Sequence, residues 1–306
     1  MQRKILLTGS NGLLGQKIVS LLTERSHIQL LATSRGINRH PLRKGYAYQS
    51  LDLTAPEAVE HVFETFVPTD VIHTAAMTQV DACEDNREAC DAINVHAVET
   101  LCRMCKKHGS RLVHLSTDFV FDGTAGPYRE EDSPNPLSYY GLSKLKAEQI
   151  IQESQVNHAI LRTILLYGIT PAMSRSNIVL WVKSSLEAEK EIRVVHDQVR
   201  SPTLAEDLAT ACVSAVMKEA EGVYHVSGGE IMSVVEIARK VADFWKLDQS
   251  LITEIDSSTL KQKARRPPVT GFILLKAQTE LAYKPHSFEQ GLAVLNRQMQ
   301  ESWNGE

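Results

Sequence analysis

Short apolar runs alternate with amphipathic stretches along the first half of the chain. The runs are five to eight residues long, which is typical of strands buried on both faces of a parallel sheet. In the stretches between them, apolar residues recur every three or four positions, as on one face of a helix. Strands are expected at residues 4–8, 28–34, 46–51, 70–74, 111–116 and 159–166, and helices at 56–66, 87–108, 138–154 and from the first turn to residue 22. The alternation predicts an α/β fold with a doubly wound parallel sheet.

The turn after the first strand is rich in glycine. It reads Gly9-Ser10-Asn11-Gly12-Leu13-Leu14-Gly15 and leads directly into a helical pattern. Glycines let a backbone turn tightly and approach a pyrophosphate, while the helix start offers unpaired N–H groups and a partial positive charge. Three glycines can also form only a tight turn, but the order strand, turn and helix favours a Rossmann-like dinucleotide-binding site.

The ends of the second and third strands bear on the choice of coenzyme. The second strand ends in Ser34-Arg35, where an acidic residue would bind the ribose 2′-hydroxyl of NAD. Arg35, with Arg39 nearby, would instead face a 2′-phosphate. We therefore expect NADPH, with NADH as the alternative and a solvated loop arginine as the other interpretation. Asp52 and Leu53, after the third strand, are expected at the adenine edge.

The second half of the chain has a different pattern. Helices are expected at residues 177–189, 204–217 and 234–245, strands at 192–195 and 222–226, and loops at 196–203 and 265–268. No long linker separates the halves. We expect residues 1–168 to form the dinucleotide-binding domain and residues 169–306 a smaller mixed α/β lobe that binds substrate, with the chain crossing between lobes near 200–230 and a cleft between them.

Three side chains with complementary chemistry follow the strand at 111–116. Tyr140 and Lys144 are four positions apart on a predicted helix and therefore share a face, and Thr117 ends the preceding strand. The Lys144 ammonium is expected to lower the pKa of the Tyr140 phenol. The phenol can then give a proton to a carbonyl oxygen as hydride reaches its carbon, while Thr117 polarises that oxygen. The Tyr-x-x-x-Lys spacing alone is common by chance, so its position after Thr117 carries the inference.

Arg200, Arg265 and Arg266 are candidates for binding substrate phosphates. Guanidinium groups bind phosphate oxygens by charge-assisted, bidentate hydrogen bonds. A solvated surface position is the alternative for each of them.

The composition limits the class of protein and of partner. With 43% hydrophobic and 23% charged residues among 306, the chain is neither disordered nor fibrous. A net charge of -4 gives no electrostatic footprint for nucleic acid or an anionic membrane. We find no signal peptide and no apolar run of about 18 residues. The expectation is therefore a cytoplasmic protein with neither nucleic acid nor membrane as partner.

The five cysteines are too few and too unevenly spaced for a disulfide framework, which also fits a reducing compartment. Cys102 and Cys105 form a Cys-x-x-Cys pair, but they fall inside the helix expected at 87–108, so we expect core residues rather than a zinc or redox site. The eleven histidines show no metal-ligand spacing. No metal is expected.

These features together resemble the extended short-chain dehydrogenase/reductases, and within them the dTDP-4-dehydrorhamnose reductase group of nucleotide-sugar enzymes. The similarity covers nearly the whole chain. Its motifs are the glycine turn, Ala75-Ala76 with Thr78 and Val80-Asp81, Asn94, Ser116-Thr117-Asp118 with Val120-Phe121, Tyr140, Lys144, Arg162-Thr163, Asp197-Gln198, Pro202-Thr203 and the Arg-Arg-Pro near the end.

The resemblance implies reduction of a 4-keto-6-deoxyhexose on a nucleoside diphosphate, the last step towards an L-rhamnose-type sugar donor. Thr117, Tyr140 and Lys144 would be the catalytic trio, with Tyr140 as proton donor and Lys144 also holding the nicotinamide ribose. The cofactor would contact Gly9, Ser10, Asn11, Gly12, Leu13, Leu14, Ser34, Arg35, Asp52, Leu53, Ala75, Ala76, Thr78, Asn94, Tyr140 and Lys144. The nucleotide-sugar substrate would contact Val80, Asp118, Phe119, Asn177, Arg200 and Arg266. The resemblance leaves open whether the protein forms a homodimer.

Two departures from the family pattern bear on substrate and metal. Ile164-Leu165 stands where the rhamnose enzymes carry a substrate-facing tryptophan, so the identity of the sugar stays open. Lys17 stands where some of those enzymes have a glutamate tied to a magnesium-linked dimer. No such metal is therefore expected.

Two other functions are compatible with the same features. The family resembles the regulatory subunit of methionine adenosyltransferase, so the chain could be a cofactor-binding regulator of a partner protein. An epimerase or dehydratase of sugar nucleotides is the third interpretation, because a dehydratase would use an acid beside Thr117 and Asp118 is in place. Tight retention of the cofactor through turnover would favour this third interpretation, whereas rapid exchange would favour a reductase.

Overall fold

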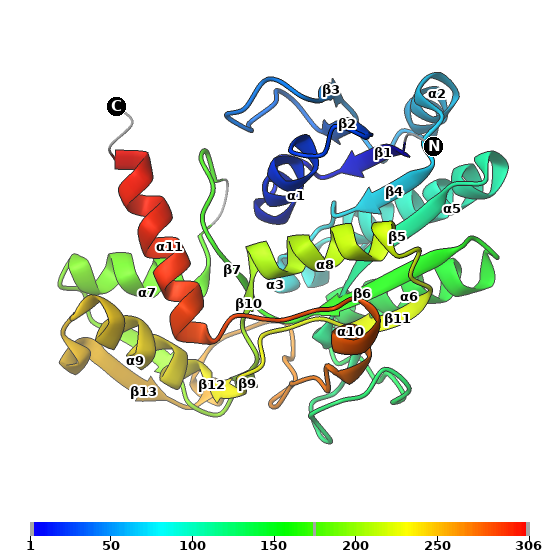
Figure 1. The fold of residues 1–306 in the computed structure, drawn as a ribbon. Helices are drawn as coiled ribbons and strands as arrows, with labels where there is room; N and C mark the ends of the chain where they lie inside the picture. The colour runs from blue at the N-terminus through cyan, green and yellow to red at the C-terminus, as the bar shows by residue number, and fades with distance from the viewer. Residues whose placement is uncertain (1–2, 174–175, 304–306) are drawn as a thin grey trace.

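The computed structural model describes residues 3–173 and 176–303 and builds them around a seven-stranded parallel sheet (Figure 1). The strand order is β11-β6-β5-β4-β1-β2-β3, and each neighbouring pair is parallel. The strands are β1 (Arg3–Thr8), β2 (Ile28–Ser34), β3 (Ala47–Ser50), β4 (Asp70–His73), β5 (Arg111–Thr117), β6 (His158–Thr163) and β11 (Gly222–His225). The Rossmann-like doubly wound fold is confirmed. The order reverses between β1 and β4, and ligands of such sheets bind at the carboxyl ends of strands flanking this point.

Helices cover both faces of the sheet because consecutive strand residues point to opposite sides. In β1, Ile5 and Leu7 pack on one face and Leu6 on the other, and all three are fully buried. The face of Ile5 is covered by α1 (Leu13–Thr23) and α8 (Ala205–Met217), and the face of Leu6 by α2 (Pro56–Phe66), α5 (Ala97–His108) and α6 (Tyr139–Glu153). Cys102 and Cys105 lie in the second of these cores, as expected for core residues.

The helix expected at 87–108 is present but interrupted. It consists of α4 (Arg87–Asp91), a π-helical turn at Ala92–His96 and then α5. A short helix, α3 (Val80–Asp85), precedes it. The π turn carries Asn94, which is buried and bonded to groups outside its own helix. The apolar periodicity of the helix does not predict this π turn, because the hydrogen bonds of Asn94 are made with residues outside the helix.

The strand expected at 159–166 is wrong at its end. β6 stops at Thr163, and Leu165 has a positive φ of 41°, which breaks the strand. The chain resumes as β7 (Leu166–Tyr167), which pairs with β10 (Thr203–Leu204). The loop expected at 196–203 accordingly contains β9 (Val199–Arg200) and the start of β10. These two-residue strands are too short to leave a pattern in the sequence.

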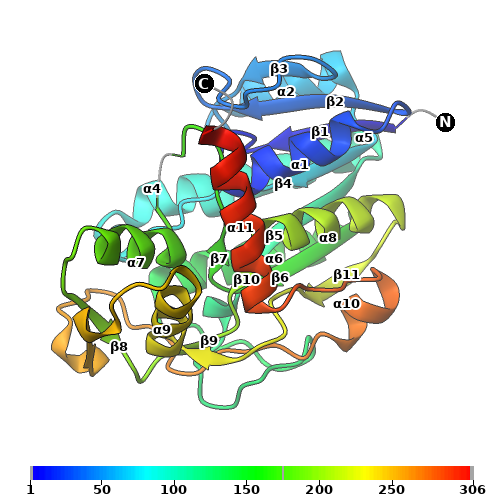
Figure 2. The ribbon, with the colours of Figure 1, turned by 60° about the vertical axis from the view of Figure 1, so that its left-hand side comes forward.

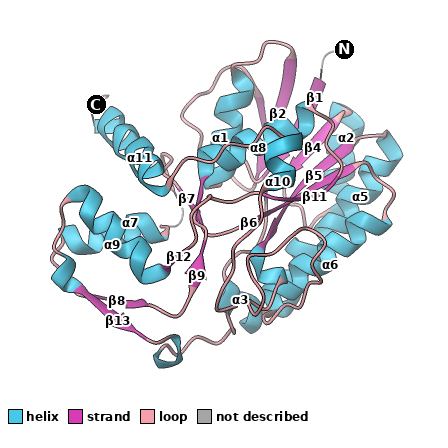
Figure 3. Cartoon of the chain, turned by 60° about the horizontal axis from the view of Figure 1, so that its bottom comes forward, coloured by secondary structure: helices cyan, strands magenta, loops and turns pink. Residues whose placement is uncertain are grey.

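A smaller group of elements gathers beside the sheet (Figures 2 and 3). It contains α7 (Ile178–Glu187), β8 (Ile192–Val195), β12 (Met232–Ser233), α9 (Val234–Trp245), β13 (Ile252–Ile255) and α11 (Phe288–Trp303), with α10 (Leu275–Glu280) packed near β11. β13 pairs with β8, and β12 with β9. A third apolar core, which includes Val179, Val241 and Leu295, joins α7, α9 and α11. We propose this group as the substrate lobe.

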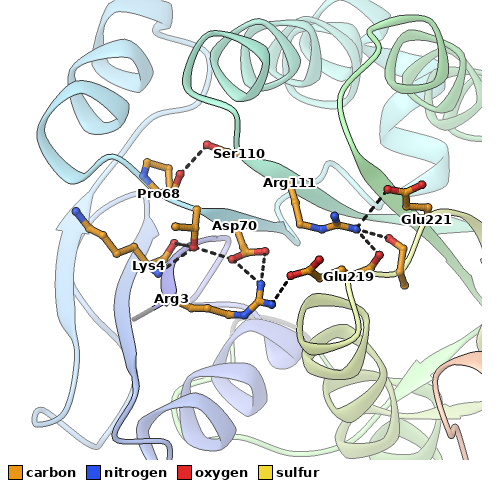
Figure 4. Close-up of polar contacts among 10 residues, drawn as sticks. Arg3, Lys4, Pro68, Asp70, Ser110, Arg111, Glu219 and Glu221 are labelled. Atoms are coloured by element: carbon orange, nitrogen blue, oxygen red, sulfur yellow. Dashed lines mark hydrogen bonds and ion pairs between the residues drawn. The ribbon is translucent and has the colours of Figure 1, made fainter. Parts of the chain in front are cut away.

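Charged and polar side chains tie the amino ends of the strands together (Figure 4). Arg3 on β1 pairs with the buried Asp70 on β4 at 3.2 Å and with Glu219 at 2.7 Å. Arg111, at the start of β5, donates to the Ala220 carbonyl at 3.2 Å. Ser110 donates to the Pro68 carbonyl at 2.7 Å. This end of the sheet is thus fixed by polar contacts, and the opposite end is left to the ligand cavity.

Within the described ranges, no helix is long and apolar enough to cross a lipid bilayer.

Candidate active site

A cavity of about 1100 Å³ lies at the carboxyl ends of β1, β2, β4 and β5 and extends to the substrate lobe. The sheet side of its wall carries Gly9, Ser34, Ala75 and Thr117, which follow or end these four strands. Predicted site residues that line it are Gly9, Asn11, Gly12, Leu13, Leu14, Ser34, Arg35, Asp52, Leu53, Ala75, Ala76, Thr78, Val80, Thr117, Asp118, Phe119, Tyr140, Lys144, Asn177, Arg200 and Arg266. The structure therefore brings most of the candidates to one place.

The glycine turn is shaped for close approach of a phosphate. Gly9 has a positive φ of 74°, and a Cβ added there would lie 2.7 Å from the Ala75 amide nitrogen. α1 begins after Gly12 without a side-chain cap, so the N–H groups of its first turn are free to meet an anion. These features fit the pyrophosphate of a dinucleotide.

Asn11 holds the loop after β2 against the glycine turn. Its Oδ1 accepts a hydrogen bond from the Arg39 amide at 2.8 Å, and its Nδ2 donates to the Ile37 carbonyl at 2.8 Å. The Tyr48 hydroxyl donates to the Gly36 carbonyl at 2.7 Å. The loop is thus fixed at three places, and Arg35 and Arg39 stand exposed at the rim of the cavity.

Asp52 and Leu53, which follow β3, form the other side of this rim. Asp52 Oδ1 accepts hydrogen bonds from the Thr54 amide at 2.9 Å and the Thr54 hydroxyl at 2.7 Å. These bonds, and to a smaller extent the charge of Arg35, lower the pKa of the Asp52 carboxyl against a smaller opposing effect of desolvation. Leu53 is buried beside it. A polar rim over a buried leucine suits an adenosine, which has a flat apolar face and polar edges.

The expected trio meets at the inner part of the cavity. Thr117 ends β5, while Tyr140 and Lys144 lie one turn apart near the start of α6. α6 approaches the loop after β5 closely, since a Cβ on Gly141 would lie 2.1 Å from the Phe119 carbonyl oxygen. The Phe119 and Tyr140 rings meet edge to face with centroids 5.7 Å apart. The missing side chain at Gly141 therefore allows Tyr140 to sit beside Thr117.

The protonation of Tyr140 differs from the expectation. Burial raises the pKa of the Tyr140 phenol, and a hydrogen bond with the Thr117 side chain only partly opposes this rise. The expected lowering of this pKa is therefore wrong, because desolvation of the phenolate dominates. Burial also lowers the pKa of Lys144 to about 8, against the opposing charges of Glu148 and Cys90. Tyr140 is thus held in its protonated, acid form at neutral pH.

Asp118 is bound to its neighbours from two sides. Its Oδ1 accepts from the Thr117 hydroxyl at 3.1 Å and its Oδ2 from the Thr270 hydroxyl at 2.6 Å. Burial raises the pKa of the Asp118 carboxyl, although the charge of Arg200 and these two hydrogen bonds oppose the rise. The proton of the Thr117 hydroxyl is therefore directed at Asp118, and it must turn to reach a substrate oxygen.

The predicted substrate arginines occupy different environments. Arg200 is buried and donates to the Val199 carbonyl at 2.7 Å and the Pro268 carbonyl at 3.1 Å. Arg266 forms an ion pair with Asp81 at 2.9 Å on the cavity wall. Arg265 is exposed, and the cavity lining does not include it. Two of the three arginines can therefore face a ligand.

Asn177 both caps a helix and lines the cavity. Its Oδ1 accepts from the Leu180 amide at 3.2 Å, and its Nδ2 donates to the Gly168 carbonyl at 2.7 Å. This joins the start of α7 to the loop after β7.

Ser10 and Asn94 are not brought into the cavity. Ser10 is buried, its amide donates to the Thr33 carbonyl at 3.0 Å, and its hydroxyl has no partner within the described ranges. Asn94 exchanges two hydrogen bonds with the backbone of Met77 and donates to the Ser143 hydroxyl at 3.0 Å. We therefore propose a positioning role for Asn94, which fixes the loop after β4.

The substrate lobe supplies lining residues that the sequence did not reveal. They include Trp181 on α7, Arg193 and Val194 on β8, Gln198, Leu260 and Gln262. Trp181 keeps 39% of its surface exposed, which is high for so large an apolar side chain. A tryptophan on the predicted helix at 177–189 was the available signal, but only the packing of the lobe brings it to the cavity.

Lys17 makes contacts within the chain. Its Nζ lies 2.7 Å from Glu206 and 3.1 Å from Gln298. In the part of the chain that the structure describes, no group of three or more His, Cys, Asp or Glu side chains is arranged to hold a metal ion.

Comparison with known proteins agrees with this geometry. The sequence model of the family described as RmlD substrate binding domain matches residues 3–301. Methionine adenosyltransferase 2 subunit beta of Bos taurus is 32% identical over 275 residues, which cover 87% of this chain and 78% of that protein. The probable low-salt glycan biosynthesis reductase Agl14 of Haloferax volcanii is 30% identical over 293 residues, covering 94% and 96%.

Solved structures give the same family. A dTDP-4-dehydrorhamnose reductase of Clostridium acetobutylicum superposes with a TM-score of 0.86 at 28% identity, covering 97% of this chain and 99% of that chain. The dTDP-4-dehydrorhamnose reductase of Bacillus anthracis, solved in complex with NADP, gives 0.82 at 27% identity, covering 97% and 100%. The chain thus closely matches a group of NAD(P)-dependent oxidoreductases. It belongs to the RmlD substrate-binding-domain family of extended short-chain dehydrogenase/reductases.

Proposed function

We propose that this protein reduces the 4-keto group of a nucleoside-diphosphate 6-deoxyhexose with NADPH, in the manner of a dTDP-4-dehydrorhamnose reductase. The observation that carries the proposal is the meeting of Thr117, Tyr140 and Lys144 inside a cavity that runs from the glycine turn to the substrate lobe. At about 1100 Å³, the cavity is slightly larger than the usual ligand pocket of about 300–1,000 Å³, as two ligands together would require.

Each residue of the trio has a distinct task. NADPH, when bound, supplies the hydride. Tyr140 holds the proton that goes to the substrate oxygen, and its raised pKa keeps that proton in place at neutral pH. The Thr117 hydroxyl turns from Asp118 to donate to the same oxygen. The Lys144 ammonium stabilises the tyrosinate that remains and restores its proton.

The two ends of the cavity favour different parts of the ligands. Arg35 and Arg39, held by Asn11 at the rim beside Asp52, support a 2′-phosphate and therefore NADPH over NADH. Arg200, Arg266 and Arg193 place positive charge at the lobe side, where a nucleoside diphosphate would need it.

Oxidation of NADPH, followed by its absorbance, tests the proposal. The purified protein is given freshly generated dTDP-4-keto-6-deoxy-L-hexose or the GDP-linked ketosugar, and Tyr140→Phe is the matched variant. Turnover with either sugar, lowered at least ~100-fold in the variant at unchanged NADPH affinity, supports the proposal. No turnover with either sugar despite NADPH binding, or near-normal turnover of the variant, counts against it.

A second candidate function rests on the similarity to methionine adenosyltransferase 2 subunit beta. In that role the chain would bind a partner enzyme, with the cofactor as a structural ligand. Size-exclusion chromatography with a methionine adenosyltransferase catalytic subunit from the same organism distinguishes the two. Co-elution that survives Tyr140→Phe, without ketosugar reduction by the unmodified protein, would favour the subunit role.

An epimerase or dehydratase is the third candidate, and it depends on Asp118. The raised pKa of this carboxyl suits an acid, but its two oxygens are engaged by Thr117 and Thr270. Cofactor that stays bound through many turnovers, with no net oxidation of added NADPH, would favour this candidate.

A further inference from the structure

The Lys144 side chain has a buried hydrogen-bond partner outside the trio. Nζ of Lys144 lies 3.0 Å from Nε2 of His114, which stands on β5 three residues before Thr117. His114 is fully buried and Lys144 nearly so. The contact joins the reactive end of α6 to the interior of the sheet. In the part of the chain that the structure describes, Nζ of Lys144 has no hydrogen-bond partner other than His114.

The chemistry of the pair fixes the state of the imidazole. An ammonium has only N–H donors, so Nε2 of His114 accepts while Lys144 is charged. The ring proton is then on Nδ1, which is buried and has no hydrogen-bond partner within the described ranges. A protonated Nε2 would point a second donor at the ammonium. Burial and the charge of Lys144 lower the pKa of His114 well below its ordinary value, so the ring stays neutral.

The surroundings of the pair contain few charges. His73, the register partner on β4, stacks on His114 with ring centroids 5.2 Å apart, and its Nδ1 lies 2.7 Å from the Thr8 hydroxyl. The other titratable groups that face the pair are His158 at the start of β6, Glu148 and Tyr140 on α6, and Cys90 on α4. Glu148 is itself paired with Arg162 at 2.7 Å. Among His114 and these neighbouring groups, only His114 forms a hydrogen bond with Nζ of Lys144 in the part of the chain that the structure describes.

We propose that His114 is a positioning residue of the reductase, whose Nε2 aims the Lys144 ammonium at the cavity and keeps it charged in a buried place. The inference rests on the proposed reductase function. Without an acceptor, the buried ammonium loses a hydrogen bond that favours its charged form, and its proton leaves at lower pH. Loss of the acceptor therefore lowers the pH at which the Lys144 ammonium loses its proton and, with it, its role in the reaction.

The test compares three variants and one control. His114→Leu removes the acceptor at similar size, His114→Gln offers an amide oxygen near the position of Nε2, and His114→Asn carries the same amide on a shorter side chain. His73→Leu makes the same change on the stacked neighbour without touching the bond to Nζ. For each protein, kcat, KM and the dissociation constant of NADPH are measured from pH 6 to 10.

The expected result is a shift that follows the acceptor. His114→Leu should lower kcat by at least ~10-fold and move the alkaline limb of kcat, and of NADPH binding, down by about one pH unit. His114→Gln should restore the limb, His114→Asn should restore it less, and His73→Leu should leave it in place. If all four variants keep the limb of the unmodified protein, or if His73→Leu moves it equally, the positioning role is wrong.

Two features of the test separate this inference from the proposed function. NADPH binding is read without turnover, so the shift can appear or fail even if no ketosugar is reduced. If His114→Leu does not fold, the comparison of His114→Gln with His114→Asn decides, because the two differ in reach and share the same polar group. Equal limbs in that pair and in the unmodified protein would overturn the inference.

Discussion

Asn94 and Met77 are joined by two hydrogen bonds, one in each direction: Oδ1 of Asn94 accepts from the Met77 amide at 2.8 Å, and Nδ2 donates to the Met77 carbonyl at 3.0 Å. A third bond, from Nδ2 to the Ser143 hydroxyl at 3.0 Å, reaches α6 one residue before Lys144. One buried amide thus fixes both the loop after β4 and the helix that carries the trio.

Asn94→Ala should therefore weaken cofactor binding although Asn94 does not line the cavity. We expect a rise of about 5-fold or more in the dissociation constant of NADPH, and a loss of about 1 to 3 kcal/mol in the free energy of unfolding, because the half-buried Met77 backbone loses both hydrogen-bond partners. Titration of NADPH fluorescence and urea unfolding measure the two effects. An unchanged dissociation constant in a destabilised Asn94→Ala protein would make Asn94 a structural residue only.

The choice of coenzyme should depend on Arg35. Arg35→Ala should weaken NADPH by about 10-fold or more and NADH by less than about 2-fold, because only NADPH has the 2′-phosphate that the guanidinium would bind. Arg43→Ala is the matched control: Arg43 lies on the same loop, donates to the Asn38 carbonyl at 2.9 Å and does not line the cavity. Equal losses for both coenzymes in Arg35→Ala would refute the assignment.

The buried Lys144 ammonium should lower the free energy of unfolding at neutral pH. Its pKa is lowered from 10.5 to about 8, so between these values the unfolded chain holds a proton that the folded protein has released. The free energy of unfolding therefore rises with pH across this window, and the full cost is present below pH 8. Lys144→Met should be more stable at pH 7 by about 1 to 3 kcal/mol, less whatever is lost with the His114 hydrogen bond. Urea unfolding at pH 7 and at pH 10 checks this, since the advantage should shrink at the higher pH. A constant difference would mean that the charge of Lys144 is not responsible.

The polar cluster at the amino ends of the strands should act on stability alone (Figure 4). Asp70→Ala leaves Arg3 and the Thr69 hydroxyl without the carboxylate that they share, and we expect a loss of about 2 kcal/mol in the free energy of unfolding. Glu219→Ala removes the exposed partner of Arg3 and should leave Tm nearly unchanged. Both variants should keep the kcat of the unmodified protein. A loss of kcat in Asp70→Ala would show that this cluster reaches the cavity after all.

The sequence predicted the fold well because the fold depends on local patterns. β2 and α2 have the bounds that the apolar periodicity predicted, and the glycine turn between β1 and α1 lies where its motif indicated. The errors occur where a distant contact decides. The apolar run at 159–166 contains nothing that marks the positive φ of Leu165, after which β7 pairs with β10 rather than continuing β6.

The candidate site shows the same division. Tyr140 and Lys144 could be paired from the sequence because they are one helical turn apart. The bond between Lys144 and His114 joins residues 30 positions apart, and the bond between Asp118 and Thr270 joins residues 152 apart. The direction of the Tyr140 pKa was also predicted incorrectly, since the depth of burial is a property of the whole fold rather than of a motif.

The most direct test of the proposed reaction follows a deuterium atom. The unmodified protein and Tyr140→Phe are incubated with NADPH that carries deuterium at both C4 positions and with dTDP-4-keto-6-deoxy-L-hexose, and the sugar nucleotide is analysed by mass spectrometry and NMR. The proposal predicts a reduced sugar with one deuterium at C4, formed at least ~100-fold more slowly by Tyr140→Phe. Bound NADPH with no deuterium transferred to this or the GDP-linked sugar would contradict it.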